Sequence, residues 1–505
     1  MAPDQAYRDL TALWRERALL ESCATLLGWD EETYLPDGGV EVRAEQHALL
    51  ARLEHERAID PRVAELLAEA EAGLNAAPAA DGDHGRAVML RNLQLMRRDH
   101  EAAICVPSSL IEELARTTTR AQSAWEEARD DSDPAPYLPV LARVVELTCA
   151  WADCVRGESS RYDACLDEWE PDLTEAEVVD TLAALRAPLA ALVDRVLGAP
   201  SPPARPLPAV SVAEQHAMSQ LAARWIGFDL SGGRIDLAAH PSTMRIGPGD
   251  VRLTTRFDPE RPLRGLLSTL HEVGHGIYDQ NLPAEHFGTP VGEASSLALH
   301  ESQARLVENV IGRSHGFWRF ALPRLAQVAP ALGALEVDDV VYTLGRVARS
   351  TNRVHADELT YDLHIAIRVD LERALLRGDL TCADLPGAWD EAYARTLSRP
   401  SSAAEGLLQD GHWAAGMFGY FPTYTLGNVI GAQLLATATR ELGELEPRFA
   451  TGELAPLIGW LRDAVHRHAG IVPARELVER ATGAPPSPAA LLARLGARYA
   501  ALYRL

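Results

Sequence analysis

Apolar residues recur every three or four positions along most of the chain, which is the spacing of residues on one face of an α-helix. The stretch VVDTLAALRAPLAALVDRVL shows this pattern and is rich in residues that favour helices. The same periodicity predicts helices from residue 5 to about 195, and again from the residues that follow 257 to the C-terminus. We therefore expect a mainly α fold.

Residues 227–257 have a different pattern. GFDLSGGRIDLAA and DVRLTTRF alternate apolar and polar side chains, and GPGD precedes the second of these runs as a turn signal. This alternation predicts a short hairpin. We expect a small antiparallel β-sheet beside the central cleft of the helical fold.

Loops are predicted where turn-forming residues cluster, at LPDGG (35–39), AAPAADGDHG (76–85) and DDSDPAP (130–136). GAPSPPARPLP (198–208) holds five prolines, which cannot donate backbone hydrogen bonds or sit inside helices. It is the best candidate for a boundary between a helical N-terminal region (residues 1–197) and a catalytic region with the HExxH helix (residues 209–505). We predict that both belong to one domain, 1–505.

The chain has no lysine, because all 48 of its Lys and Arg residues are arginine. This excludes a Schiff-base nucleophile, a pyridoxal-phosphate enzyme and a P-loop nucleotidase, each of which needs a lysine amine at the reacting centre. Against 72 acidic residues the formal net charge is −24, which repels phosphate backbones. Nucleic acid is therefore not an expected partner.

The six cysteines form no CxxC pair, so reduced, buried thiols are expected. The first residues carry acidic side chains early and never develop an apolar run with a small-residue cleavage site. No stretch approaches 18 consecutive apolar residues, so no membrane span is predicted. These features predict a cytoplasmic protein with no membrane contact.

The run RPLRGLLSTLHEVGHGIYDQNLP contains an HExxH motif formed by His271, Glu272 and His275. Residues i and i+4 share a helix face, so both imidazoles can bind one metal ion. Glu272 can then take a proton from a water molecule at the metal and return it to a leaving amine. Gly274 and Gly276 weaken the same helix, which indicates that another segment approaches its backbone closely. The alternative is two core histidines beside a surface glutamate.

A catalytic zinc ion needs a third protein ligand and one open position. The candidates downstream are His286, Glu293, His300 and Glu301. Glu301 follows His275 by 26 residues on a helical run, the distance needed for a loop and an antiparallel helix, and is our choice. Glu293 stands where a carboxylate would cap a helix, and His300 could support a ligand or simply pack. Cobalt could occupy the same N/O ligands.

Five ordered blocks make the sequence similar to one family. HPSTMRIGPGDVRLTTRF, HEVGH, HESQ, NRVHAD and GLLQDGHW resemble the signature blocks of the carboxypeptidase Taq family of HExxH zinc metallocarboxypeptidases. The likeness begins near LLGWDEETYLPDGGVEVRAEQ (26–46) and runs to the C-terminus.

The resemblance implies that His271, His275 and Glu301 bind Zn²⁺ and that Glu272 is the general base and acid. It also implies a helical fold with a long substrate groove, covered by the N-terminal region. The expected activity is release of single C-terminal residues from peptides with a free C-terminus, by a homodimer.

A carboxypeptidase must recognise a free carboxylate, and without lysine only arginine supplies a permanent bidentate cation. Arg353, in the NRVHAD block, is the first candidate, and a surface pair with Asp357 is its alternative. Arg252, in DVRLTT, is the second candidate, and a strand-surface charge is its alternative.

Donors to the developing oxyanion are sought in QDGHWAAGMFGYFPTYTLGN. An aromatic-rich stretch is more often part of a core. With the family likeness, His412 and Tyr424 become candidate substrate or oxyanion donors, with Tyr420 in reserve. His240 is a further candidate for substrate binding. The chain departs from the family here, because Ser242 follows His240-Pro241 where the pattern has phenylalanine, which puts the inherited preference for peptide length in doubt.

Two rival functions remain open from the sequence. A zinc endopeptidase or oligopeptidase could use the same ligands. An aminopeptidase would need a motif resembling GxMEN, which does not occur. A non-catalytic metal-binding protein could have kept the motif after losing turnover, although all four reacting positions are present.

Overall fold

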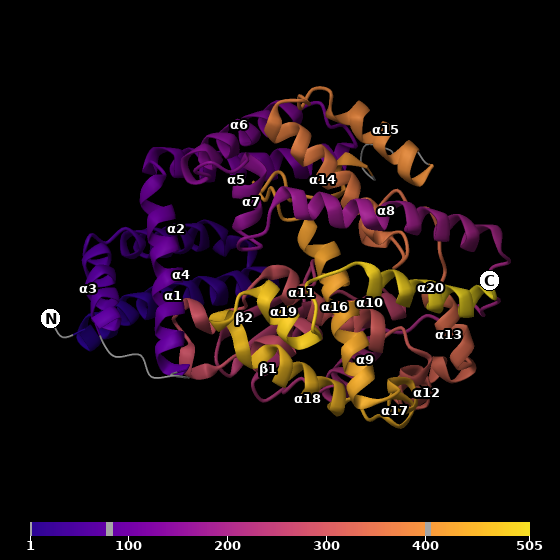
Figure 1. The fold of residues 1–505 in the computed structure, drawn as a ribbon. Helices are drawn as coiled ribbons and strands as arrows, with labels where there is room; N and C mark the ends of the chain where they lie inside the picture. The colour runs from indigo at the N-terminus through magenta and orange to yellow at the C-terminus, as the bar shows by residue number, and fades with distance from the viewer. Residues whose placement is uncertain (1–2, 77–83, 399–405) are drawn as a thin grey trace.

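The N-terminal half of the protein is helical, as the periodicity predicts. The computed structural model describes residues 3–76, 84–398 and 406–505. Of its first eight helices, the first four lie at the left of the view in Figure 1, the fifth and sixth lie above them, and the eighth crosses the middle of the view toward the right. They are α1 (Pro3–Thr33), α2 (Val40–Ala58), α3 (Arg62–Ala76), α4 (His84–Cys105), α5 (Ser108–Asp131), α6 (Leu138–Val155), α7 (Arg161–Asp167) and α8 (Glu175–Gly198).

Most of the predicted breaks fall between helices. A 3₁₀ turn, η1 (Asp37–Gly39), separates α1 from α2, and residues 132–137 separate α5 from α6. The predicted loop at 76–85 lies mostly outside the described residues. The proline-rich segment 198–208 has no helix beyond its first residue and leads to α9 (Val212–Ile226).

The small sheet has three strands in the order β1-β3-β2: β1 (Gly233–Leu237), β2 (Ser242–Gly247) and β3 (Asp250–Thr255). A hairpin is present in the predicted region, but its strands are β2 and β3, which are antiparallel and joined by a tight turn, whereas the first of the two predicted runs contains β1. The expectation of a purely antiparallel sheet is wrong, since β1 runs parallel to β3. Residues 238–241 carry the chain past the end of β3, so β3 inserts between β1 and β2. Alternation of side chains predicts strands but not which strand lies in the middle.

Helices resume after the sheet and continue to the C-terminus. They comprise α10 (Pro262–Gln280), α11 (Leu297–Arg305), α12 (His315–Leu325), α13 (Val337–Leu344), α14 (Tyr361–Arg377), α15 (Leu385–Leu397), α16 (Pro422–Leu442), α17 (Leu445–Thr451), α18 (Ala455–Ala464), α19 (Ala474–Thr482) and α20 (Ala489–Tyr503).

Two large apolar cores hold these elements together. One surrounds α10 and includes buried residues of α9, β3, α11, α12 and α16. The other joins α6 and α8 of the N-terminal half to α14, α16 and α20 of the C-terminal half. Residues from both sides of the proline-rich segment in the sequence therefore share one core. A third, smaller core lies within α1, α3 and α4. The helix α16 contributes to both large cores and therefore packs at the centre of the molecule (Figure 1).

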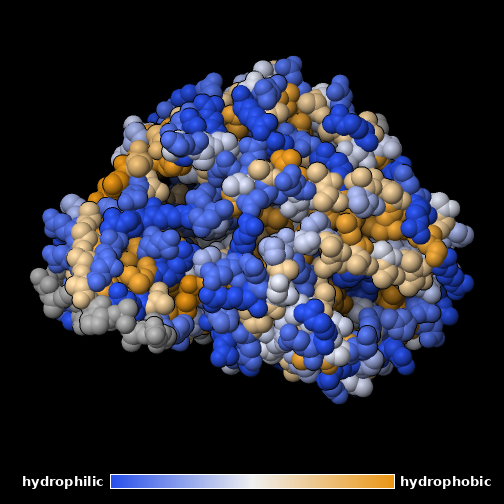
Figure 2. Space-filling model, in the orientation of Figure 1, coloured by the Kyte–Doolittle hydropathy of each residue, from blue (hydrophilic) through white to orange (hydrophobic). Residues whose placement is uncertain are grey.

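The face of the molecule drawn in Figure 2 is mostly hydrophilic, with apolar side chains scattered over it. Within the residues that the structure covers, no helix combines the length and the apolar character needed to cross a membrane. All six cysteines are free thiols. The expectation that they are buried holds for Cys165 and Cys382 and is wrong for Cys23 and Cys105, which are exposed.

Candidate metal centre

Helix α10 carries the HExxH residues and packs beneath the sheet. His271 and His275 lie one turn apart, with their Nε2 atoms 3.2 Å from each other. Glu272 is buried between α10 and the edge strand β2. The Thr243 hydroxyl of that strand donates a 2.8 Å hydrogen bond to Glu272 Oε2 and thereby orients the carboxylate.

The helix α11 brings Glu301 to the two histidines. The predicted close approach to the α10 backbone is present, because a Cβ atom on Gly274 would lie 2.5 Å from the Cα of Ala304. On its other side α11 packs against α16, where a Cβ on Gly427 would lie 2.5 Å from Cγ of Glu301. Because glycine has no side chain, Gly274 and Gly427 let α10 and α16 approach α11 closely on both sides of Glu301.

The three candidate ligands fit a tetrahedral metal site. Glu301 Oε2 lies 3.3 Å from His275 Nε2 and 3.7 Å from His271 Nε2. Atoms bound about 2.0–2.1 Å from a tetrahedral zinc ion lie roughly 3.3 Å from one another. Two imidazole nitrogens and one carboxylate oxygen also form the donor set of catalytic zinc sites, with a fourth position left open. This group is the candidate metal site found among the described residues.

A second carboxylate supports the first histidine. Glu308 accepts a 3.1 Å hydrogen bond from His271 Nδ1, which leaves Nε2 of the same ring free to bind a metal. Arg305 contacts both Glu301, at 2.7 Å, and Glu308, at 3.2 Å. Glu308 lies in a π-helical segment, η4 (Leu306–Ile311), that continues α11. Glu308 could not be identified from the sequence, because no local pattern predicts the change of helical pitch that turns it toward His271.

The charges of the centre are strongly coupled. Burial opposes the charged form of His271, but Glu301 and Glu308 outweigh it and raise its pKa to about 9. Burial and the neighbouring His300 lower the pKa of His275 to about 4. Burial also raises the pKa of Glu272 above its ordinary value, as suits a group that must accept and return a proton.

The other candidates for the third ligand lie elsewhere. His300 stacks on His275, with ring centroids 4.4 Å apart, and contacts Asp279 at 2.9 Å. The side chain of Glu293 is half exposed and is paired with Arg245 of β2 at 2.7 Å. His286 lies in a separate 3₁₀ turn, η2 (Ala284–His286).

Arg353 begins a 3₁₀ turn, η6 (Arg353–His355), and is buried. Its guanidinium donates to Asp410 Oδ1 at 2.7 Å and to the Tyr361 hydroxyl at 2.8 Å. The carboxylate of Asp357, the alternative partner considered from the sequence, instead accepts from the backbone of Ala348 and from Thr360.

Asp410 also accepts a 2.7 Å hydrogen bond from Arg368, which is fully buried. One carboxylate is thus shared by two arginines, and the group carries one excess positive charge. Arg368 and Asp410 lie 15 and 57 residues from Arg353 and were not among the residues predicted from the sequence.

The three aromatic candidates surround this cationic group. The ring of Tyr424 lies 4.7 Å from the Arg353 guanidinium carbon, and its hydroxyl lies 3.2 Å from His412 Nε2. The ring of Tyr420 lies 5.4 Å from that of Tyr424 and 5.2 Å from His412. Burial lowers the pKa of His412 to about 4 and raises the pKa of Tyr424 well above its ordinary value. Both side chains are therefore uncharged at neutral pH.

Arg252 and His240 belong to the sheet region. Arg252 forms an ion pair with Asp250 of its own strand at 2.8 Å and lies 4.2 Å from the ring of Trp29. His240 is exposed, and its carbonyl accepts from Thr254. Ser242, which stands where the family pattern has phenylalanine, is hydrogen-bonded to Thr254 at 2.8 Å.

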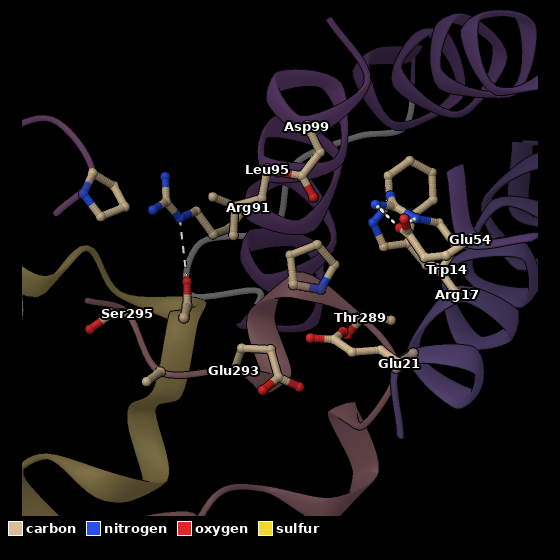
Figure 3. A pocket seen from close by; sticks show the side chains of 16 residues that line it. Trp14, Arg17, Glu21, Glu54, Arg91, Leu95, Asp99, Thr289, Glu293 and Ser295 are labelled. Atoms are coloured by element: carbon tan, nitrogen blue, oxygen red, sulfur yellow. Dashed lines mark hydrogen bonds and ion pairs between the residues drawn. The ribbon is translucent and has the colours of Figure 1, made fainter. Parts of the chain in front are cut away.

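A cavity of about 320 Å³ opens between the N-terminal helices and the segment that leads into α11, and none of the candidate metal ligands lines it. Figure 3 shows its walls: α1 and α2 on one side, α4 behind, and residues 288–295 below. Glu293 connects this cavity to the sheet through its ion pair with Arg245, two residues along β2 from Thr243. The charged residues that line the cavity are Arg17, Glu21, Glu54, Arg91, Asp99 and Glu293.

Comparisons with known proteins agree with one another. The model of the carboxypeptidase Taq (M32) metallopeptidases matches residues 9–499. Thermostable carboxypeptidase 1 of Thermus thermophilus is 44% identical over 518 residues, covering all of both chains, and carboxypeptidase 1 of Bacillus subtilis is 32% identical over 484 residues, covering 95% of each. The crystal structure of the M32 carboxypeptidase from Deinococcus radiodurans R1 superposes with a TM-score of 0.94 at 36% identity, covering 99% of this chain and 100% of that one.

Proposed function

Because the chain belongs to the carboxypeptidase Taq (M32) family and is a metallocarboxypeptidase that releases C-terminal amino acids, we propose which of its residues carry out the reaction. His271, His275 and Glu301 hold the metal, which is Zn²⁺, with Co²⁺ as a possible substitute. Glu272 is the general base and acid. One observation carries this proposal: the three ligand atoms lie within 4.8 Å of one another, and Glu272 directly follows the ligand His271 in the sequence.

Glu272 moves the proton during hydrolysis. A bound zinc ion would polarise the scissile carbonyl and lower the pKa of water. Thr243 holds the Glu272 carboxylate by a 2.8 Å hydrogen bond, and burial raises its pKa, so it can both accept and return a proton. It takes a proton from the attacking water and delivers it to the nitrogen of the departing amino acid.

The terminal carboxylate of the peptide binds at Arg353. The group formed by Arg353, Arg368 and Asp410 carries one excess positive charge and is buried, so a substrate carboxylate would neutralise it in a medium where charge pairing is strong. Arg252 remains the second candidate, but its charge is already balanced by Asp250 and it stacks on Trp29.

His412 and Tyr424 donate to the substrate or to the developing oxyanion, and Tyr420 lies beside them in reserve. Because burial keeps the Tyr424 hydroxyl protonated, it can act as a hydrogen-bond donor throughout the working pH range. His240 contacts the peptide further along the sheet.

The remaining proposals concern the whole molecule. Residues 1–505 form one domain, since one apolar core spans the segment 198–208. The N-terminal region, residues 1–197, covers the substrate groove, for which the cavity between α1, α4 and residues 288–295 is the support. The substrates are peptides with a free C-terminus, the protein is a cytoplasmic homodimer, and nucleic acid and membranes are not its partners.

The test compares peptides that differ only at the C-terminus. A peptide with a free carboxylate is expected to lose residues one at a time, read by mass spectrometry, and its C-terminally amidated twin is expected to resist. Glu272→Gln should retain zinc and lose turnover by roughly 10²- to 10⁴-fold. Equal cleavage of both peptides would indicate an endopeptidase, and an active Glu272→Gln protein would remove Glu272 from its role.

A further inference from the structure

The segment between α7 and α8 binds the first turn of the helix that carries Glu301. The Trp169 carbonyl accepts a 3.1 Å hydrogen bond from the Leu297 N–H, and Glu170 Oε1 accepts one from the Ala298 N–H. The N–H groups at the start of a helix have no partner within the helix. Two of those of α11 are therefore bound by a segment that lies more than 120 residues earlier in the chain.

The same segment also contacts the aromatic part of the site. Trp169 Nε1 donates a 2.9 Å hydrogen bond to the Phe418 carbonyl, and its ring meets the Tyr420 ring edge-on, with centroids 5.0 Å apart. Between these two contacts Gly419 has φ +74, and a Cβ atom there would lie 2.6 Å from the carbonyl carbon of Cys165. The backbone of the loop before α16 thus packs directly against the backbone of α7, just ahead of Trp169.

We propose that Glu170 is a positioning residue for the metal ligand Glu301 and that Trp169 is a positioning residue for Tyr420. The inference rests on the proposed function, because it takes Glu301 to be a ligand. Glu301 is the fifth residue of α11 and directly follows its first turn, so a displacement of that turn is transmitted to it. Metal–ligand distances tolerate only about 0.2 Å of error, so a small displacement is enough to weaken binding.

The environment of Glu170 shows how it acts. Its exposed fraction is 6%, so water cannot easily replace its carboxyl group at the Ala298 N–H. Burial raises its pKa to about 8, against the opposing effect of the hydrogen bonds from Ala298 and Ser296. The group is therefore largely an uncharged acid at neutral pH that acts through hydrogen bonds. Glutamine has the same shape and can accept the same hydrogen bond, whereas alanine cannot.

A matched control exists elsewhere in the chain. Glu446 Oε2 accepts a 2.6 Å hydrogen bond from the N–H of Gly316, the second residue of α12, just as Glu170 accepts from the second residue of α11. Helix α12 carries none of the candidate site residues. Glu446→Ala and Glu170→Ala therefore remove the same kind of bond, from an exposed side chain in the first case and a buried one in the second, and only the second lies behind a metal ligand.

The experiment measures Tm, zinc affinity by competition with a chromophoric chelator, and kcat and KM on one peptide. Both alanine variants are expected to lower Tm. Only Glu170→Ala should weaken zinc binding, by about tenfold or more, and lower kcat with KM nearly unchanged. Glu170→Gln should restore zinc affinity and kcat. Trp169→Ala should raise KM at unchanged zinc affinity, and Trp169→Phe, which keeps an aromatic edge against Tyr420, should raise it less.

The results that overturn the inference are equally definite. If Glu170→Ala loses no more zinc affinity and kcat than Glu446→Ala, Glu170 does not position the ligand, and an unchanged KM in Trp169→Ala removes that residue from its role. If Glu170→Ala does not fold, Glu170→Asp, whose carboxyl is one methylene shorter, is judged by the same criterion. Glu301→Gln distinguishes a failure of the proposed ligand set from a failure of the positioning role. If Glu301→Gln retains zinc, the proposed ligand set is refuted. If Glu301→Gln loses zinc while Glu170→Ala binds it normally, only the positioning role is refuted.

Discussion

Replacing Arg353 by methionine tests carboxylate recognition in this molecule. The substitution keeps an unbranched stem of similar volume and removes the guanidinium. Asp410 would remain bound to Arg368, at 2.6–2.7 Å, so no buried carboxylate is left without a partner. The group then carries no net charge in place of one excess positive charge. The variant should therefore fold and yet lose the attraction for a substrate carboxylate.

The size of the effect follows from the bond that is lost. A hydrogen bond to a charged group contributes about 1.5–3 kcal/mol, and each 1.4 kcal/mol is a factor of ten in affinity. We expect the KM of a peptide with a free C-terminus to rise roughly 10- to 150-fold, while kcat changes much less because Glu272 and the metal ligands are untouched.

The assay is steady-state kinetics on a peptide with a free C-terminus and on its amidated form. The wild-type protein and Arg353→Met are compared with Arg252→Met as the matched variant. The wild-type protein should discriminate strongly between the two peptides, Arg353→Met weakly, and Arg252→Met as the wild type does. A KM within twofold of the wild-type value in Arg353→Met would refute the reasoning. An equal or larger rise in Arg252→Met would assign the carboxylate to the strand instead. Circular dichroism and Tm establish that both variants are folded.

Three further outcomes are expected. Burial raises the pKa of Glu372 to about 8, against hydrogen bonds from Trp413 and Tyr162, so the folded state holds a proton that the unfolded state releases near pH 4.5. The resulting stabilisation is complete below that pH and declines by up to about 1.4 kcal/mol per pH unit as the pH rises to about 8. Urea unfolding at several pH values should detect this decline, and Glu372→Gln should reduce its slope, leaving the part that belongs to Glu170, whose pKa is also raised to about 8. Gly274→Ala would place a methyl 2.5 Å from the Ala304 Cα, so it should lower the unfolding free energy by about 1–3 kcal/mol and weaken zinc binding; unchanged values would show that α10 and α11 can separate freely. Dialysis against a chelator should abolish activity and lower Tm, and added Zn²⁺ should restore both; full activity in metal-free protein would contradict the proposed centre.

Much of the centre could be predicted because its signals are local. His271 and His275 are four residues apart on a strongly periodic helix, so their common face follows from helix geometry alone. The two glycines of that helix indicated a close neighbour, and Gly274 packs against α11. The choice of Glu301 over His286, Glu293 and His300 rested on the length of a loop and a helix, and the structure brings Glu301 to the histidines.

Errors and omissions arose where partners are distant in the sequence. Contrary to expectation, β1 is parallel to β3, because β3 lies between β1 and β2 in the sheet. The order of the strands depends on the whole sheet, and the alternation of side chains along one strand does not predict it. The pairing of Arg353 with Asp357, the alternative to substrate binding, is wrong, because in the structure Arg353 shares Asp410 with Arg368. Neither partner has a local pattern that would reveal it.

The sequence alone determined the helical class, the HExxH face, the candidate third ligand and the assignment of every permanent positive charge to arginine. Each of these follows from residue type or from spacing within one element or between neighbouring ones. Only the tertiary structure decided which carboxylate supports His271, how two arginines share one aspartate, and how Trp169 and Glu170 bind both α11 and the loop before α16. These contacts join residues that lie from tens to hundreds of positions apart in the chain. Their distances are set by the packing of whole helices, and no short sequence pattern encodes that packing.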